Sequence, residues 1–375
     1  MSTITSGRGK AVLMIAHVAG MIDLVALPVW VGTLVQHYHY DFKRAGMTVT
    51  CFLLGVVAAS LLAGPRFHRL PRRWCAVAGY ALSALGFLMA AATTDSAALL
   101  GLHVVAGAGT GLGLSMTHGA IGRSPNPHRL FAMAGAALGV FAVLFYAIVP
   151  PLTLSMGGSV LFLVMGGLMA LAALAALDFP CLDVQAGHGA RVVGRMAATA
   201  WIAIGGVACM ALNQAIIFSF LERIGVTRGF GQDRVNGVLV VIGLINLVPA
   251  VLAAVLQQRL AATRVACIAP LVQAVLAVTI ALSPTFGPYA AAASMFAFVL
   301  IFTHTFLFGL LARLDPGGRA VALTPAMLMA GSAIGPGLAG LVAQQVGFEG
   351  LGMLAVLVAF VASACFIKVS RTHQG

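Results

Sequence analysis

The sequence predicts an all-α integral membrane protein with twelve transmembrane helices, from its composition, the length of its apolar runs and the placement of its basic residues. Of the 375 residues, 61% are hydrophobic and 8% are charged, whereas about 25% of the residues of a soluble domain are charged. Too few polar groups are therefore available to cover a water-facing surface. The apolar runs are continuous and about 17–26 residues long, as helices that cross a ~30 Å hydrocarbon core require. A membrane barrel would instead show alternating segments of about ten residues.

Twelve apolar runs follow one another along the chain. We predict spans at about 11–35, 46–63, 74–92, 97–121, 130–154, 158–179, 196–221, 235–256, 265–282, 287–311, 320–346 and 351–367. Only one connection, residues 180–195, is both long and polar. We therefore expect a six-helix bundle over 1–179, a cytoplasmic linker over 180–195 and a second six-helix bundle over 196–375. The first apolar run is long and further apolar runs follow it, so we expect a retained helix rather than a cleaved signal peptide.

The basic residues predict the orientation of the chain. With the N-terminus inside, 16 of the 21 lysines and arginines fall on the inner side and 5 on the outer side. The positive-inside rule then places both termini in the cytoplasm, with the protein in the cytoplasmic (inner) membrane. The net charge of +12 is spread over helix ends, so we expect no nucleic acid partner. The six cysteines are scattered, and neither a disulfide framework nor a metal site is expected.

A strongly basic loop, GPRFHRLPRR at residues 64–73, lies between the second and third predicted spans. It resembles the G-x-L-a-D-R-x-G-R-R signature of the major facilitator superfamily of transporters. Gly64, Arg69, Arg72 and Arg73 match, while His68 stands in place of the family's aspartate. In that family the aspartate and arginines lock one conformation. The resemblance therefore implies a gate loop, with a lock that is weaker here or depends on pH near neutrality.

Two further motifs resemble the same family. HVVAGAGTG at 103–111 is similar to the R-x-x-q-G-x-G-x-G pattern of helix four, with His103 replacing an arginine that the family links to proton coupling. GSAIGPGLAG at 331–340 resembles g-x-x-x-G-P-x-x-G-G, which implies helix packing through Gly331, Gly335, Pro336 and Gly340. Drug/proton antiporters carry that pattern in helix five. Here helix five has no proline after its glycines at 135–139, which weighs against an antiporter.

The resemblance implies two pseudo-symmetric six-helix bundles around a midplane cavity, and secondary active transport by alternating access. We expect proton-coupled efflux of a small, partly apolar organic molecule, because no lysine or arginine lies mid-span to hold a carboxylate or phosphate. A proton-coupled importer, a gradient-independent facilitator of a small metabolite and a non-transporting membrane receptor stay open as alternatives. Nucleotide-binding and catalytic motifs are absent from the sequence, so we expect neither an enzyme nor a cofactor. A monomer is expected by family analogy.

Asp23 is the acidic residue that lies in the middle of a predicted span. A charge there costs about 2.5–3.5 kcal/mol on insertion scales. We predict a proton-carrying or cation-binding carboxylate, and the alternative is a structural carboxyl bonded to a neighbouring helix. The stretch 21–28 also loosely resembles the first-helix aspartate signature of drug exporters, which ends in Ala-Leu-Pro. Pro28 is expected to bend the helix and free a carbonyl that helps to shape a cavity.

Other polar groups within spans are candidates for a substrate cavity or for contacts between helices. His103 is the histidine that we favour for proton coupling, alongside Asp23. The candidates for the substrate cavity are Asn213, Gln214, Asn246, His304 and Tyr146. The neutral amides among them could equally join helices, and Tyr146 could simply pack. The sequence HYHYD at 37–41 could bind a metal, but an outer aromatic belt also explains its tyrosines.

Overall fold

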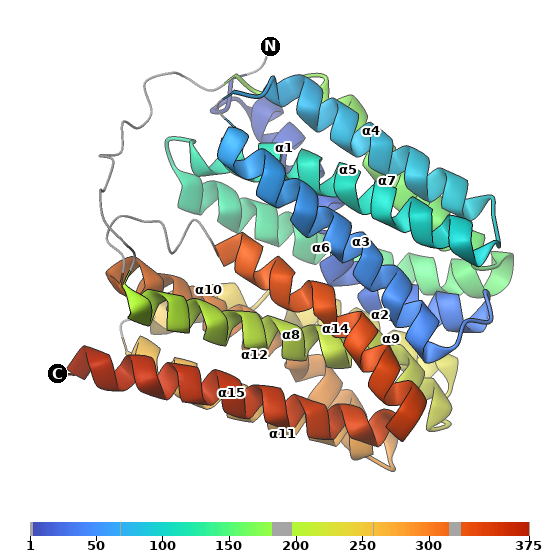
Figure 1. Ribbon diagram of the computed structural model, residues 1–375, viewed down its shortest axis with the longest axis vertical. Coiled ribbons are helices and arrows are strands. Elements are labelled where there is room, and N and C mark those ends of the chain that lie inside the picture. The colour runs from blue at the N-terminus through green and yellow to red at the C-terminus, as the bar shows by residue number, and fades with distance from the viewer. Residues whose placement is uncertain (1–2, 68, 182–196, 258, 315–323, 375) are drawn as a thin grey trace. The chain divides into compact units, whose positions relative to one another are not determined.

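The computed structural model describes residues 3–67, 69–181, 197–257, 259–314 and 324–374, and the regular structure in these ranges is helical (Figure 1). The helices are α1 (Gly7–Gly20), α2 (Asp23–Gln36), α3 (Phe42–Ala63), η1 (Gly64–Arg66), α4 (Arg72–Ala91), α5 (Ser96–Gly122), α6 (Pro127–Met156), α7 (Ser159–Ala176), α8 (Ala198–Thr227), α9 (Gln232–Ile245), α10 (Pro249–Leu256), α11 (Ala262–Leu282), α12 (Phe286–Leu314), α14 (Thr324–Val346) and α15 (Phe348–Gln374).

Eleven helical segments within the described residues are long and apolar enough to cross a membrane. This confirms a multi-pass membrane protein. The segment Gly7–Gln36 comprises both α1 and α2. The predicted span 235–256 is divided between α9 and α10, and each piece alone is shorter than a span. The division falls just before Pro249, because proline offers no N–H to the helix.

The chain forms two compact units. The first unit comprises Met1–His39 and Thr48–Ala190, and the second comprises Tyr40–Met47 and Arg191–Gly375. The start of α3 thus belongs with the second unit, although the rest of that helix belongs with the first. Within the first unit α4 packs along α5 and α7, and within the second α8 packs along α14 and α15.

Close packing of the helices depends on small residues. In the first unit, a Cβ added to Gly79 of α4 would lie 2.7 Å from the carbonyl oxygen of Gly109 in α5, and a Cβ on Gly109 would meet the carbonyl oxygen of Gly79. The two backbones therefore touch where neither residue has a side chain. Such close approach is a principal means by which helices associate in lipid.

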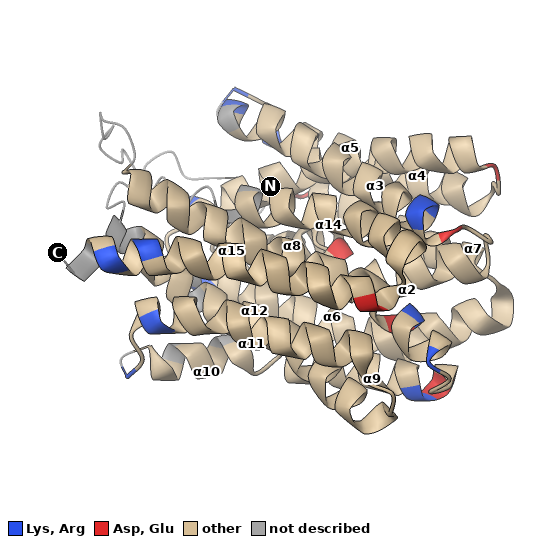
Figure 2. Ribbon diagram, turned by 60° about the horizontal axis from the view of Figure 1, so that its bottom comes forward, with Lys and Arg blue, Asp and Glu red and all other residues tan. Residues whose placement is uncertain are grey.

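The surfaces of the helices suit a bilayer. Lysine, arginine, aspartate and glutamate gather at helix ends, with long uncharged stretches between them (Figure 2). Large apolar side chains face outward along these stretches, and Leu62, Val255 and Leu357 are 63%, 66% and 64% exposed. Water would penalise this exposure heavily, whereas lipid tails do not.

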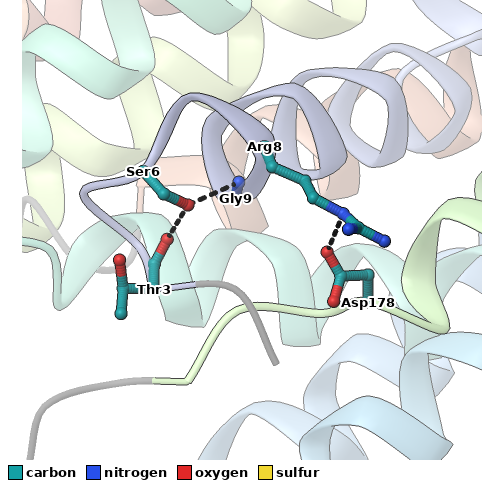
Figure 3. Close-up of polar contacts among 5 residues, drawn as sticks. All are labelled: Thr3, Ser6, Arg8, Gly9 and Asp178. Atoms are coloured by element: carbon teal, nitrogen blue, oxygen red, sulfur yellow. Dashed lines mark hydrogen bonds and ion pairs between the residues drawn. The ribbon is translucent and has the colours of Figure 1, made fainter.

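Polar contacts tie the start of α1 to the segment that follows α7 (Figure 3). The Ser6 hydroxyl donates to the carbonyl of Thr3 at 2.7 Å and accepts from the N–H of Gly9 at 3.0 Å. Ser6 therefore caps the first turn of α1. Arg8 Nε lies 2.6 Å from Asp178 Oδ2 and forms an ion pair between the two ends of this unit's chain.

Candidate functional site

The helix that carries Asp23 is interrupted immediately before that residue. α1 ends at Gly20 and α2 begins at Asp23 (Figure 1). In the turn between them, Ile22 N–H donates to the carbonyl of Ala19, and Leu24 N–H to that of Met21, each three residues earlier. The sequence predicted a bend caused by Pro28, yet Pro28 lies inside α2 and the break lies nearly two turns earlier.

Asp23 is buried at this break without a side-chain partner. Its side chain is 3% exposed, and its Oδ1 accepts no hydrogen bond. Among the described residues, no lysine, arginine or histidine forms an ion pair with it. Its place in the first turn of α2 puts the carboxylate at the positive end of that helix dipole. The dipole offsets part of the burial cost, but a bare oxygen in this setting still calls for a proton or a cation.

An aromatic cluster fixes the next turns of α2. Trp30 lies seven residues after Asp23, hence on the same face of α2 and about 10 Å further along it. Its indole Nε1–H donates to Nε2 of His103 in α5 at 3.1 Å. His103 Nδ1 lies 2.6 Å from the carbonyl of Leu99 and must donate to it, because a carbonyl only accepts. Both imidazole nitrogens are thus used, which holds His103 in one neutral tautomer.

The rings around this pair complete a packed core in the first unit. Trp30 packs edge-on against the ring of Phe52 at 5.0 Å, and the His103 ring packs edge-on against that of Phe162 at 5.3 Å. Tyr146, a predicted cavity residue, lies in α6, and its hydroxyl donates to the carbonyl of Val25 at 2.7 Å. Asp23 lies on α2, while His103 accepts a hydrogen bond from Trp30 and Tyr146 donates one to Val25 of the same helix. The three predicted residues are therefore linked through α2.

A cluster of neutral amides lies in the second unit. Asn213 and Gln214 of α8 were expected at a cavity, and both bond to Gln273 of α11. Asn213 Nδ2 donates to Gln273 Oε1 at 3.5 Å, and Gln273 Nε2 donates to Gln214 Oε1 at 3.4 Å. The bonds are long, and Asn213 Oδ1 is buried without a partner. The cluster therefore has spare hydrogen-bonding capacity for a polar group of a ligand.

A second buried carboxylate lies elsewhere in α8. Glu222 was placed at a helix end by the sequence, but α8 continues to Thr227 and leaves Glu222 only 5% exposed. Gln232 Nε2 donates to Glu222 Oε1 at 2.8 Å and to Asn236 Oδ1 at 3.1 Å. Glu222 Oε2 has no partner. Charged residues after position 221 lower the hydropathy of that stretch, which is why sequence analysis ended the span too early.

Two of the predicted cavity residues lie apart from the amide cluster. Asn246 follows the last residue of α9, where the helix stops before α10, and its Oδ1 has no hydrogen-bond partner. His304 of α12 stacks on Phe308 at 5.6 Å, and its Nε2 is unpartnered. Among the described residues, no hydrogen bond or ring contact joins either one to Asn213 or Gln214.

The basic loop is anchored by an aromatic side chain. Phe67 is buried, and a Cβ added to Gly119 of α5 would collide with its ring. The guanidinium carbons of Arg123 and Arg72 lie 4.3 and 5.6 Å from the centre of the Phe67 ring. Burial, with a further effect of Arg72, lowers the pKa of Arg123, which nevertheless stays charged.

The other predicted gate residues surround that anchor. Gly64 begins η1, Arg69 is exposed, and the guanidinium of Arg73 lies 5.1 Å from the centre of the Trp74 ring. His68, the residue that replaces the family's aspartate, lies outside the described residues. The role of this loop as a gate stays a prediction.

The glycines of the 331–340 motif lie where α14 meets other backbones of the second unit. A Cβ on Gly331 would collide with the carbonyl of Ala208 in α8, and a Cβ on Gly340 with that of Phe42 at the start of α3. Gly335 likewise abuts Ala215, and Pro336 lies within α14. Close packing is the contact that these residues make.

The histidines after α2 show no metal cluster. Burial, with a further effect of His39, lowers the pKa of His37, and Tyr38 packs against the ring of Phe162 at 5.6 Å. Across the described part of the chain, no group of three histidine, cysteine, aspartate or glutamate residues is placed to hold a metal ion.

Comparison with known proteins places this geometry in a family. The model of the Major Facilitator Superfamily matches residues 12–316. A bacterial homologue of the human lysosomal transporter Spinster, in an inward-facing and occupied conformation, aligns with TM-score 0.75 and 15% identity over 99% of this chain and 98% of that chain. The nucleoside transporter NupG aligns with TM-score 0.73 and 12% identity, over 96% and 99% of the two chains.

A D-xylose–proton symporter aligns with TM-score 0.72 and 14% identity, over 94% of this chain and 96% of that chain. Among curated proteins, no sequence matches this chain. At such identities the structural likeness establishes the fold alone.

Proposed function

Because the chain belongs to the Major Facilitator Superfamily of transporters, we propose that it exports a small, partly apolar organic molecule in exchange for protons by alternating access. It is a secondary transporter by family, and the finer assignment depends on one observation. That observation is the buried carboxyl of Asp23 at a helix break, with one oxygen that has no partner.

A proton is the ligand that fits this carboxyl best. When Asp23 is ionised, its charge lies inside the membrane-spanning part of the first unit without an ion-pair partner among the described residues, and an unpaired charge is costly there. When Asp23 is protonated, the charge is gone and the break between α1 and α2 can repack. A change of charge at a break thus gives a two-state element that proton binding can bias.

His103 contributes through Trp30 in this proposal. Its two nitrogens are used by Leu99 and Trp30, so it holds α2 in place and does not itself carry the proton. It is a positioning residue for Asp23, which lies two helical turns before Trp30 on α2.

The substrate is proposed to be uncharged or singly charged and partly apolar. In the second unit, Asn213, Gln214 and Gln273 offer amide groups with one buried oxygen unpaired. Amides bond to hydroxyl, carbonyl or amine groups of a ligand without a net charge of their own.

The test uses inverted membrane vesicles with an imposed proton gradient, acidic inside, and a pH-sensitive dye. A panel of organic compounds is added to vesicles that contain the native protein, Asp23→Asn or Asp178→Asn. Asp178 lies outside the spans and pairs with exposed Arg8, so its variant is a matched control for the loss of a carboxylate. We expect compound-dependent proton release from the native and Asp178→Asn proteins and none from Asp23→Asn.

The other outcomes separate the alternatives. Compound flux that ignores the proton gradient would indicate a facilitator and refute coupling. Compound that leaves preloaded vesicles together with protons would indicate an importer and refute the proposed direction. Proton release that survives Asp23→Asn would remove Asp23 from the mechanism.

A further inference from the structure

We propose that His17 and His118 in the first unit form a proton-binding site in which two imidazoles share one added proton. The proposal rests on the proton-coupled function above and adds a second proton site to it. The two histidines come from α1 and α5 and lie far apart in the sequence, so their pairing becomes visible only in the fold.

The geometry is that of a direct hydrogen bond between two imidazoles. Nδ1 of His17 lies 3.0 Å from Nε2 of His118, with ring centroids 5.1 Å apart and planes inclined by 34°. Two neutral rings make this bond when one donates and the other accepts. A proton taken from water adds to the outer nitrogen of the donor ring. The shared bond then becomes a charge-assisted N⁺–H···N bond, and loss of that proton to water restores the neutral pair.

Among the described residues, each ring of the pair has one nitrogen that forms no hydrogen bond, whereas both nitrogens of His103 form one. Among the described residues, the hydrogen bonds of the pair use one nitrogen of each ring, so His17 Nε2 and His118 Nδ1 form none. By contrast, both nitrogens of His103 are taken. Of these histidines, only the paired ones can gain a proton without breaking an existing hydrogen bond.

The contacts beside the pair hold it in register. The hydroxyl of Tyr80 in α4 lies 2.7 Å from the carbonyl oxygen of Ala16 and 3.0 Å from the hydroxyl of Thr117. Ala16 and Thr117 each precede one of the histidines. One tyrosine therefore bridges α1 and α5 next to the imidazole bond and keeps the two rings within reach of each other.

The two helix ends at the break between α1 and α2 favour a positive charge on His17 and a negative charge on Asp23. His17 lies in the last turn of α1, where the negative end of the helix dipole favours a cation. Asp23 lies in the first turn of α2, where the positive end favours an anion. His17 is 7% exposed, so such compensation is needed if it is to carry charge.

Few ionisable groups face the pair from the elements packed around it. Tyr80 of α4 is adjacent, the ring of Phe131 from α6 lies edge-on to His118 at 5.6 Å, and α7 contributes no ionisable residue. On the other side of the break, Asp23 is the nearest acidic residue in sequence. The remaining ionisable side chains described on these helices are Arg8 and Lys10 of α1, Arg72, Arg73 and Cys75 of α4, His103 of α5, and Arg129 and Tyr146 of α6.

The first experiment is the pH profile of compound-driven proton release in the vesicle assay. His17→Asn, His118→Gln and the double variant are compared with the native protein, and His39→Asn is the control because it removes an exposed imidazole outside the helices. Because the pair holds one proton jointly, either single change should shift the half-maximal pH by about one unit, and the double variant should shift it no further. An unchanged profile in folded single variants would make the bond structural only and overturn the proposal.

A second measurement does not depend on transport. Nitrogen NMR of the full-length protein in nanodiscs, with ¹⁵N-labelled imidazoles, should show the two rings taking up a single proton together, and His118→Gln should abolish this shared titration. Two independent titrations, or none between pH 4 and 9, would refute the site. A shared titration without any compound-driven proton release would leave the site standing and refute the proposed function, so the two failures can be told apart.

Discussion

Each unit buries one carboxylate in its first long span, and the two carboxylates differ in how they are held. Asp23 follows a break between two helices, and its Oδ1 has no partner. Glu222 lies inside the continuous helix α8, and its Oε1 accepts a bond from Gln232 at 2.8 Å. Each carboxylate thus has one oxygen without a partner. The difference is that an amide side chain bonds to Glu222, whereas only the backbone N–H groups of Asp23 and Leu24 bond to Asp23.

The backbone beside each carboxylate is nevertheless fixed in the same way. Tyr146 donates to the carbonyl of Val25, two residues after Asp23, and Tyr289 donates to that of Leu221, next to Glu222. Both O···O distances are 2.7 Å. Because the backbone support is alike, the difference lies in the side-chain partner and the helix break. We infer that Asp23 is free to exchange a proton and that Glu222 has a structural role.

Exchange of each acid for its amide should give the largest difference between the two units. Asp23→Asn should reduce compound-driven proton release to the level of vesicles without protein, because the group that binds the proton is gone. Glu222→Gln should leave the release measurable, since the amide can still bond to Gln232. Both variants are assayed in the vesicle system at equal protein content. Loss of coupling in Glu222→Gln but not in Asp23→Asn would invert the assignment.

Removal of the amide that bonds to Glu222 should destabilise the second unit. Gln232→Leu leaves Glu222 Oε1 buried without its partner, and an unsatisfied buried group costs about 1–3 kcal/mol. Chemical unfolding in detergent micelles should show that loss. Gln36→Leu, a change at an exposed glutamine at the end of α2, is the matched control and should cost far less. Equal effects of the two changes would mean that Gln232 does not support Glu222.

The matched tyrosines should respond alike. Tyr146→Phe and Tyr289→Phe each remove one interhelical hydrogen bond, which is worth about 0.6 kcal/mol on average in a membrane protein. Unfolding measurements on the two single variants test whether the backbone is supported equally in both units. A much larger loss for Tyr146→Phe would show that the break depends on this bond.

The ion pairs at helix ends should matter least. Arg8 and Asp178 lie 2.6 Å apart in the first unit, and Arg228 and Glu349 lie 3.8 Å apart in the second. Arg8 and Glu349 are largely exposed, so each pair should contribute no more than about 1 kcal/mol and less at high salt. Asp178→Asn and Glu349→Gln, unfolded at low and high salt, provide the check. A loss above this bound that persists in salt would contradict the estimate.

Hydropathy predicted most of the fold because each span is long, so hydropathy averaged over its length is insensitive to local detail. That same averaging hid the breaks near Asp23 and Pro249, where a turn of only a few residues interrupts an apolar run. It also ended the α8 span before Glu222, because hydropathy counts the charge of Glu222 and takes no account of the hydrogen bond that Gln232 donates to it in the fold.

The candidate site was predicted unevenly for a related reason. Asp23 stands out because an acid in an apolar run is costly, and the cost is visible in the sequence alone. Gln273 and His118 do not stand out, since a single neutral polar residue in a span costs little. Their importance comes from the residues opposite them, Asn213 and His17, which only the folded units bring close.

The most direct test of the account is infrared difference spectroscopy of the purified protein in lipid, recorded as a transported compound is added. It detects the carbonyl stretch of a protonated carboxylic acid and so reports which acid changes protonation. We predict that a carboxylic acid band changes on binding in the native protein and in Glu222→Gln and is missing in Asp23→Asn. A band that persists in Asp23→Asn and disappears in Glu222→Gln would contradict the account.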